Sequence, residues 1–255
     1  MGKIIAVTNQ KGGVGKTTTS VNLAASLAAA KCRVLLIDLD AQGNAAMGCG
    51  IDKQEVEFSS YDLLMEDVPA AQAVVHLPSL GFSVISGNAD LTADEVKLIH
   101  ADRKEQRLAD ALMPIKTDYD YILIDCPPSL NMLTLNAMVA SDSLLIPMQC
   151  EYYALEGLSA LMGTLQNIQS SVNPALHLEG ILRTMYDDRN RLTKDVSEQL
   201  IRYFGDKVFR TCIPRNVRLA EAPSYGLPVI SYDKSSRGSI AYVALANEMI
   251  ERNKL

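Results

Sequence analysis

Two lysines lie within one glycine-rich segment near the start of the sequence, NQKGGVGKTTTS. The usual phosphate-binding loop of nucleotide-binding proteins reads G-x-x-x-x-G-K-[ST]. Gly15, Lys16 and Thr17 satisfy the end of this pattern, but Gln10 occupies the position of its first glycine. The additional lysine, Lys11, follows directly. The segment therefore predicts phosphate binding by a loop that departs from the common pattern at its start.

The elements predicted around this loop are those that phosphate binding requires. The apolar run Lys3–Asn9 predicts a buried strand, and an alanine-rich helix is predicted over Lys16–Ala30. Glycines in the intervening turn allow backbone N–H groups to curl around phosphate oxygens, and the helix N-terminus adds a partial positive charge. We expect Lys16 to reach the β- and γ-phosphates and the Thr17 hydroxyl to ligate Mg²⁺. The glycines of the turn are Gly12, Gly13 and Gly15.

Three aspartates at the ends of predicted strands can complete such a site. Asp125 ends an apolar run that begins at Tyr121, and its carboxylate can hold a water molecule on Mg²⁺. Asp38 and Asp40 are spaced i and i+2 at another strand end, so both carboxylates are expected on one face and near the γ-phosphate. One would approach the water shell of the metal and the other the attacking water. The alternative is that both merely cap the following turn.

Strand and helix patterns alternate along most of the sequence. Most strand segments are apolar throughout, as expected of strands covered on both faces. The alternation predicts an α/β fold with a doubly wound, mostly parallel sheet and helices on both faces, in a single domain spanning residues 1–255. The predicted strands are Lys3–Asn9, Arg33–Asp40, Phe82–Ser86, Tyr119–Asp125, Ser143–Pro147, Leu178–Met185, Val208–Ile213 and Val229–Tyr232. The predicted helices are Lys16–Ala30, Lys104–Leu112, Leu130–Ala140, Leu155–Ser171, Thr193–Phe204 and Ser239–Glu251.

The composition is typical of a soluble globular protein: 255 residues, of which 48% are hydrophobic and 21% charged. No apolar run approaches the roughly 20 residues that span a bilayer, and we identify no export signal. Five cysteines are scattered without a C-x-x-C pair, which favours reduced thiols over disulfides or a zinc site. We therefore expect a cytoplasmic protein.

The net charge of −6 is unevenly distributed along the chain. Residues 180–218 contain nine basic and five acidic residues, so this stretch is positive within an otherwise acidic chain. The asymmetry suggests one positive surface, which would suit an anionic partner such as nucleic acid. A solvated helix face with ordinary ion pairs accounts for the same charges equally well.

Five stretches of the sequence match a known family. K-G-G-V-G-K-T-T at Lys11–Thr18, L-L-I-D-L-D-A-Q-G-N at Leu35–Asn44 and I-D-C-P-P-S at Ile124–Ser129 resemble the ParA/Soj/MinD group of P-loop ATPases. Q-C-E-Y-Y-A-L-E-G-L at Gln149–Leu158 and I-P-R-N-V-R-L-A-E-A-P-S-Y-G at Ile213–Gly226 resemble its chromosomal ParA branch, also called Soj. The resemblance covers nearly the full chain.

The resemblance implies an ATPase that uses ATP and Mg²⁺ and forms an ATP-dependent homodimer. In this family an early lysine, matching Lys11, reaches across the dimer to the ATP of the partner subunit, much as an arginine finger acts in trans. Gly12 then lies where the two backbones meet. Lys16 would bind phosphate in its own subunit, and Asp40 would position the hydrolytic water. The metal positions implied are Thr17 as ligand, with Asp38 and Asp125 in the outer shell.

The remaining nucleotide contacts and the DNA contacts are also implied by the resemblance. Pro214 and Asn216 match positions beside the adenine, and the phosphate loop contributes Gly13, Val14, Gly15 and Thr18. ParA dimers bind double-stranded DNA without sequence preference, and a ParB-type centromere-binding protein stimulates hydrolysis during chromosome or plasmid partitioning. Weak hydrolysis by the protein alone is expected. The matching DNA-binding positions are Arg189 and Arg218, with Arg191, Lys194 and Arg202 as further candidates.

Three alternative functions are compatible with a phosphate loop of this kind. A MinD-like ATPase positions division machinery at the membrane through a basic amphipathic helix, but Ala241–Leu255 has no basic face. We therefore expect no membrane association. A redox ATPase that bridges an iron–sulfur cluster is suggested only by Cys126, without a cluster motif. A P-loop ligase would transfer the γ-phosphate to a small-molecule substrate.

Overall fold

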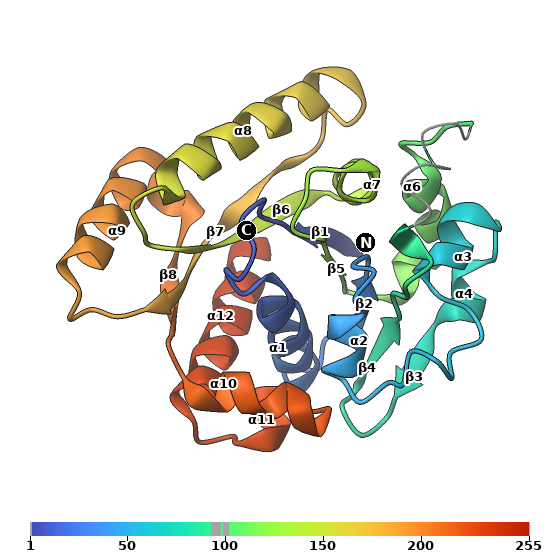
Figure 1. Cartoon of the computed structure of the whole chain (residues 1–255), viewed down its shortest axis with the longest axis horizontal. Coiled ribbons are helices and arrows are strands. Elements are labelled where there is room, and N and C mark those ends of the chain that lie inside the picture. Colours follow the sequence, from blue (N-terminus) through green and yellow to red (C-terminus); the bar gives the residue numbers. More distant parts are fainter. Residues whose placement is uncertain (1, 93–97, 99–101, 255) are drawn as a thin grey trace.

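One sheet of eight strands organises the protein (Figure 1), for which the computed structural model describes residues 2–92, 98 and 102–254. The strand order is β3-β4-β2-β5-β1-β6-β7-β8, and β3 alone runs antiparallel to its neighbour. The doubly wound, mostly parallel sheet is thus confirmed. The strands are β1 Lys3–Val7, β2 Val34–Asp38, β3 Val75–Leu77, β4 Phe82–Ile85, β5 Tyr121–Asp125, β6 Ser143–Gln149, β7 His177–Tyr186 and β8 Val208–Pro214.

Helices cover both faces of this sheet, and each face has its own apolar core. Figure 1 shows one layer below the sheet, in which α1 and α12 lie side by side, and another above it with α7 and α8. The first layer holds α1 Lys16–Ala29, α2 Asn44–Met47, α10 Val217–Glu221, α11 Val229–Tyr232 and α12 Arg237–Asn253. The second holds α3 Ser60–Met65, α4 Ala70–Ala73, α6 Arg107–Leu112, α7 Met132–Ala140, α8 Ala154–Ser171 and α9 Arg191–Phe204.

The register of the central strands brings the predicted site together. Val7 at the end of β1 and Asp38 at the end of β2 both lie opposite Asp125 at the end of β5. All three strands are parallel, so their carboxyl ends share one edge of the sheet. The phosphate loop that follows β1 therefore opens beside both aspartates.

The prediction of a strand over Val229–Tyr232 is wrong, because this segment forms the short helix α11. The carbonyl oxygen of Pro228 accepts hydrogen bonds from the N–H groups of Ser231 and Tyr232 at 2.9 and 3.0 Å. The N–H group of Val229 donates to the side-chain oxygen of Asn22 on α1 at 2.7 Å. Side-chain preference for strands is weak over four residues, and packing against α1 overrides it.

The other seven predicted strands and all six predicted helices are present, with ends that differ by a few residues. The sequence pattern did not predict β3, since three residues give too little alternation to detect. It also missed short helices between β2 and β4. Strand β3 closes one edge of the sheet, whereas α2 packs against α1.

Candidate functional site

The phosphate loop has a backbone conformation that favours glycine at two positions. Gly13 and Gly15 have φ angles of 73° and 88°, in the left-handed region where other residues are strained. Gly15 is also the N-cap residue of α1, and its carbonyl oxygen accepts the first helical hydrogen bond, from Thr19 at 2.9 Å. The loop can therefore turn directly from β1 into the N-terminus of α1, the arrangement that binds phosphate elsewhere.

Lys16 places its ammonium group within this loop. Its residue is only 7% exposed, and Nζ donates to the carbonyl oxygen of Lys11 at 3.2 Å. Burial lowers the pKa of Lys16, and the nearby carboxylates of Asp125 and Asp40 partly oppose that change. The side chain thus places a positive charge beside a carbonyl oxygen of the loop.

Asp125 joins the loop to the predicted metal position. One carboxylate oxygen accepts a hydrogen bond from the Thr17 hydroxyl, and the other accepts one from the Ser20 hydroxyl, both at 2.8 Å. Asp125 is fully buried, and burial together with the repulsion of neighbouring carboxylates raises its pKa. A cation beside Asp125 would reverse that cost. Ser20 was not predicted, although its position three residues after Thr17 places both on one helix face.

Asp38 and Asp40 have different surroundings. Asp38 is fully buried, and one of its oxygens accepts from the N–H groups of Ala45 and Ala46 at 2.9 and 3.1 Å. Its other oxygen accepts from the Asp40 N–H at 3.0 Å. Asp38 therefore holds the turn that leads into α2, as the capping alternative proposes. Asp40 also accepts a hydrogen bond in the following turn, from the Gln42 N–H at 3.0 Å. It is only half-buried, however, so its carboxylate can meet solvent near the loop.

Lys11 lies on the surface of the site. Its ammonium group forms an ion pair with Glu151, and both side chains are nearly half exposed. Two tyrosines follow Glu151, Tyr152 and Tyr153, which are 74% and 72% exposed and pack edge to face. The Lys11–Glu151 ion pair was not predicted, because it depends on β6 lying next to β1.

Strand β7 supports the loop from the side. The hydroxyl of Thr184 donates to the carbonyl oxygen of Val14 at 2.7 Å, although the two residues are far apart in the sequence. Beside this contact lies a pocket of about 200 Å³. It contains Pro214 and Asn216, the two positions predicted beside adenine, together with Thr18. The pocket lining is completed by Thr184, Met185, Ile213, Arg215, Leu219, Ala220 and Tyr242.

The side-chain amide of Asn216 already makes one hydrogen bond within the chain. Its carboxamide oxygen accepts from the N–H group of Arg218 at 3.1 Å and caps α10. That bond fixes the orientation of the amide and leaves its nitrogen as the group that can donate to a base. The structure thus brings the predicted loop residues, Asp125 and the two predicted base-pocket residues to one edge of the sheet.

The predicted DNA-binding residues divide between two neighbouring strand ends. Arg189 follows β7 and Arg218 follows β8, and these strands end in register at Tyr186 and Pro214. Arg189 pairs with Asp187, and Arg218 pairs with Glu221 and Asp233. The three further candidates, all exposed on α9, are Arg191, Lys194 and Arg202. Of the nine basic residues in this stretch, Arg183 is instead buried.

The residues around the loop fit a magnesium ion that shares its ligands with phosphate. Among the described residues, no group of three His, Cys, Asp or Glu side chains could enclose a metal by itself. Magnesium ordinarily takes only one or two protein ligands and completes its shell with water and phosphate oxygens. The Thr17 hydroxyl and the Asp125 carboxylate, joined by a 2.8 Å hydrogen bond, provide that type of donor set.

Comparison with known proteins identifies the family. A family model described as an AAA domain matches residues 2–178. The sporulation initiation inhibitor protein Soj of Bacillus subtilis is 53% identical over 249 residues, which cover 98% of this chain and 98% of that protein. The chain belongs to the ParA/Soj family of P-loop ATPases. Chromosome partitioning protein ParA of Myxococcus xanthus is 51% identical over 254 residues, covering 99% of this chain and 89% of that protein.

A solved structure agrees with this assignment at the level of the fold. Cobyrinic acid a,c-diamide synthase from Mycobacterium smegmatis, with bound ADP and magnesium, superposes with a TM-score of 0.86 at 35% identity. The match covers 100% of this chain and 96% of that chain. The chain is more similar in sequence to the ParA/Soj relatives.

Proposed function

We propose that this protein is an ATP-dependent dimerising switch that binds DNA non-specifically and hydrolyses ATP in chromosome or plasmid partitioning with a ParB-type partner. One observation carries the proposal: the Thr17–Asp125 hydrogen bond lies beside the buried Lys16 on a glycine-rich loop. This arrangement suits the phosphates and Mg²⁺ of ATP. Membership of the ParA/Soj family supports the partitioning role.

Each residue of the nucleotide site has a distinct role in this proposal. Lys16 neutralises phosphate charge in its own subunit, and Thr17 ligates Mg²⁺ while Asp125 and Asp38 orient the outer shell. Asp40, the least buried of the three aspartates, orients the water that attacks the γ-phosphate. Asn216 and Pro214 hold the base in the adjacent pocket.

The exposed surface around Lys11 supports dimerisation. Gly12 and Gly13 are exposed, and a side-chain carbon built on Gly12 would meet nothing within 4 Å. The exposed Tyr152 and Tyr153 flank this surface. A second copy placed here would cover the tyrosines and bring its own Lys11 to the nucleotide of the first subunit.

DNA binding is assigned to the basic residues after β7 and on α9 and α10. All five residues are exposed, and Arg189 and Arg218 follow strands that end at the same edge of the sheet. Both features support contacts with phosphates, which carry no base information. The assigned residues are Arg189, Arg218, Arg191, Lys194 and Arg202. Binding to DNA would associate the protein with the nucleoid.

The alternatives receive less support. Every helix in the described part of the chain is too short or too polar to span a bilayer. The apolar face of α12 packs in the core, where Tyr242, Leu245 and Met249 are at most 1% exposed. It therefore offers no lipid-binding face of the MinD type.

The redox alternative is disfavoured by the position of its cysteine. Cys126 is 1% exposed and could not bridge subunits through a cluster. A ligase activity would require a substrate-dependent turnover that DNA does not stimulate.

DNA binding measured with ATP, with ADP and without nucleotide tests the proposal. We expect wild-type protein to bind a DNA duplex tightly only with ATP and Mg²⁺. Asp40→Ala should lower ATP hydrolysis by about 10²–10⁴-fold, the usual contribution of an acid–base group, and should hold the DNA-bound state for longer. Equal DNA binding by Asp40→Ala with ATP and with ADP would refute the proposed switch.

A further inference from the structure

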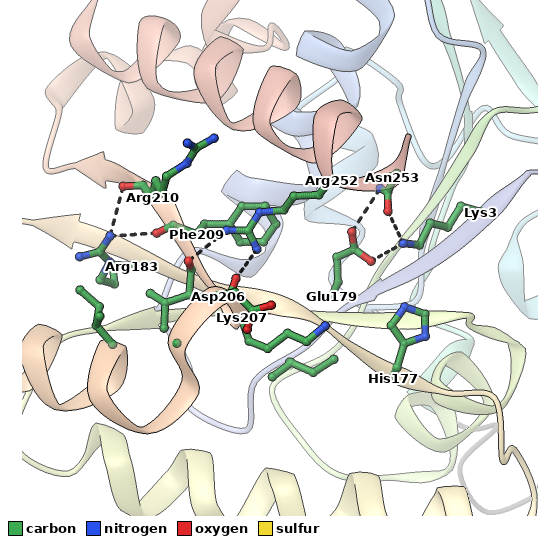
Figure 2. Close-up of a pocket in the computed structure, with 14 residues that line it drawn as sticks. Lys3, His177, Glu179, Arg183, Asp206, Lys207, Phe209, Arg210, Arg252 and Asn253 are labelled. Atoms are coloured by element: carbon green, nitrogen blue, oxygen red, sulfur yellow. Dashed lines mark hydrogen bonds and ion pairs between the residues drawn. The ribbon is translucent and has the colours of Figure 1, made fainter. Parts of the chain in front are cut away.

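A second cavity lies away from the nucleotide site, at the amino ends of β7 and β8. Its volume is about 570 Å³, within the range of small-molecule sites. Its walls come from the start of β7, the end of α9, the turn Gly205–Lys207 and the end of α12 (Figure 2). Lys3, at the amino end of β1, also lines it, whereas the phosphate loop follows the carboxyl end of that strand.

The cavity wall contains a buried cation with no counter-ion among the described residues. Arg183 is 7% exposed and donates to three neutral oxygens: the Ser197 hydroxyl at 2.8 Å and the carbonyls of Phe209 and Arg210 at 2.9 and 3.2 Å. Its Nε is buried without a hydrogen-bond partner in the described structure. The guanidinium carbon also lies 5.5 Å from the centroid of the Tyr186 ring, a contact that supplies no negative charge. Buried charges are normally paired with an opposite charge, so the wall carries a positive charge without an anionic partner in the described structure.

A lysine and a histidine lie at the end of the cavity opposite Arg183. Figure 2 shows Lys207 and His177 on the same side of it, with Lys3 and Glu179 nearby. Lys207 is exposed and has no ion pair within the described part of the chain. Lys207 is therefore available to a ligand, whereas Nδ1 of His177 already lies 3.3 Å from the carbonyl oxygen of Ala175.

The acidic groups of the cavity are largely occupied. Glu179 accepts from the ammonium group of Lys3, from the Ser143 hydroxyl and from the Asn253 amide. Arg252 and Arg210 are balanced by Glu248 and Glu251, which lie outside the cavity lining. Asp206 is the remaining acidic residue of the lining, in the exposed turn. The charges left to a ligand are thus mainly positive, from Arg183 and Lys207.

Apolar side chains separate the two positive ends. Val208 and Phe209 are buried in the cavity wall, and Ile201 of α9 is 47% exposed beside them. We propose that this cavity binds a small organic anion that carries a phosphate or carboxylate group on an apolar body. A cavity lined by uncompensated positive charge and apolar walls lowers the free energy of such a ligand.

This site is distinct from the nucleotide site even though β7 serves both. Arg183 directs its side chain to Ser197 on α9, whereas the next residue, Thr184, directs its hydroxyl to the phosphate loop. Successive residues of a strand point to opposite faces of the sheet. A ligand of the second cavity can therefore bind while the nucleotide site is filled.

The test uses the full chain saturated with Mg²⁺ and ADP, so that the phosphate loop is occupied. Inorganic phosphate and phenyl phosphate are titrated in turn at constant ionic strength, and the imidazole resonances of His177 are followed by NMR. We expect saturable shifts, with tighter binding of phenyl phosphate because of its apolar ring. Lys207→Gln should weaken both at least five-fold, and Lys234→Gln, a change at another exposed lysine, should not.

Three outcomes would overturn the proposal. Shifts that do not saturate, or equal affinities for wild type and Lys207→Gln, would show that the cavity does not select anions. Displacement of phenyl phosphate by a short DNA duplex would show that these cations serve DNA phosphates rather than a small ligand. Lys207 is exposed, so its substitution leaves the fold intact.

Discussion

At the scale of single residues, the phosphate loop combines positions that serve the subunit itself with positions that face outward. Lys16 is buried within the loop, whereas the Lys11 side chain is 48% exposed and held by Glu151. Gly12 is exposed and has open space where a side chain would project. These differences separate substitutions that should disturb nucleotide binding from those that should disturb only a dimer.

Gly12→Val should bind ATP with nearly the affinity of the wild type but fail to dimerise. A side-chain carbon built on Gly12 meets nothing within 4 Å in the single subunit, whereas a second backbone packed against the loop would clash with the valine. Light scattering with ATP and Mg²⁺ measures the effect. Gly163→Val, at a helix glycine with equally open surroundings, is the control. An ATP-dependent dimer of Gly12→Val would show that the loop does not lie at the interface.

Glu151→Gln should strengthen ATP-dependent dimerisation by about two- to five-fold, the scale of an exposed ion pair. The substitution releases Lys11 from its partner within the subunit and makes it available to the other one. Sedimentation at several protein concentrations gives the dimer affinity. Glu156→Gln, which removes the same charge from the exposed face of α8, controls for net charge. Weaker dimerisation of Glu151→Gln would mean that Glu151 itself supports the interface.

At the scale of elements, α12 secures the edge of the sheet through one buried carboxylate. Glu248 accepts from the N–H groups of Arg210 and Thr211 on β8, from the Thr211 hydroxyl and from Arg252. Burial by itself raises the pKa of Glu248, but these hydrogen bonds outweigh it and leave the pKa below its ordinary value. The stabilisation is therefore present above the ordinary pKa of glutamate and is lost as the pH falls through the lowered one.

Glu248→Gln should lower the free energy of unfolding by about 1–3 kcal/mol at neutral pH, because buried donors lose their charged acceptor. It should also reduce the loss of stability on acidification. Urea unfolding at pH 7 and pH 4 measures both effects, with Glu251→Gln on the exposed side of α12 as the control. The same acid-induced loss in Glu248→Gln as in wild type would contradict this assignment.

At the scale of the whole molecule, the parallel arrangement of β7 and β8 sets Arg189 and Arg218 at one edge of the sheet. Each is paired with carboxylates of its own chain. Contacts to DNA phosphates must therefore compete with those pairs, and exposed pairs are weak enough to be displaced.

Arg189→Ala and Arg218→Ala should each weaken binding to any DNA duplex to a similar extent and leave ATP hydrolysis without DNA unchanged. Each should also reduce the slope of log affinity against log salt concentration by about 1 in magnitude, as expected for the loss of one phosphate contact. Gel shifts over several sequences and salt concentrations provide the measurement. Arg33→Ala removes an exposed arginine paired with Asp120 before β2 and is the control. Loss confined to particular sequences would contradict phosphate contacts.

Residue types and their spacing were enough to predict the phosphate loop, the acidic strand end at Asp125 and the alternation of strands and helices. These features are local: a glycine turn between a buried strand and a helix has few other conformations, and the apolar pattern shows which segments are buried. The family stretches extended the prediction to Pro214 and Asn216, which the structure brings to the pocket beside the loop.

The residues that complete the site from distant parts of the chain could not be predicted from the sequence pattern. The bond from Thr184 to Val14 and the Lys11–Glu151 pair depend on the order in which strands lie in the sheet, and no local pattern specifies that order. Arg183 is buried without a counter-ion among the residues that the structure describes, which likewise follows from the packing of α9 on β7. The chemistry that one segment can perform follows from its residue types and their spacing. Contacts between segments depend on the packing of the whole chain.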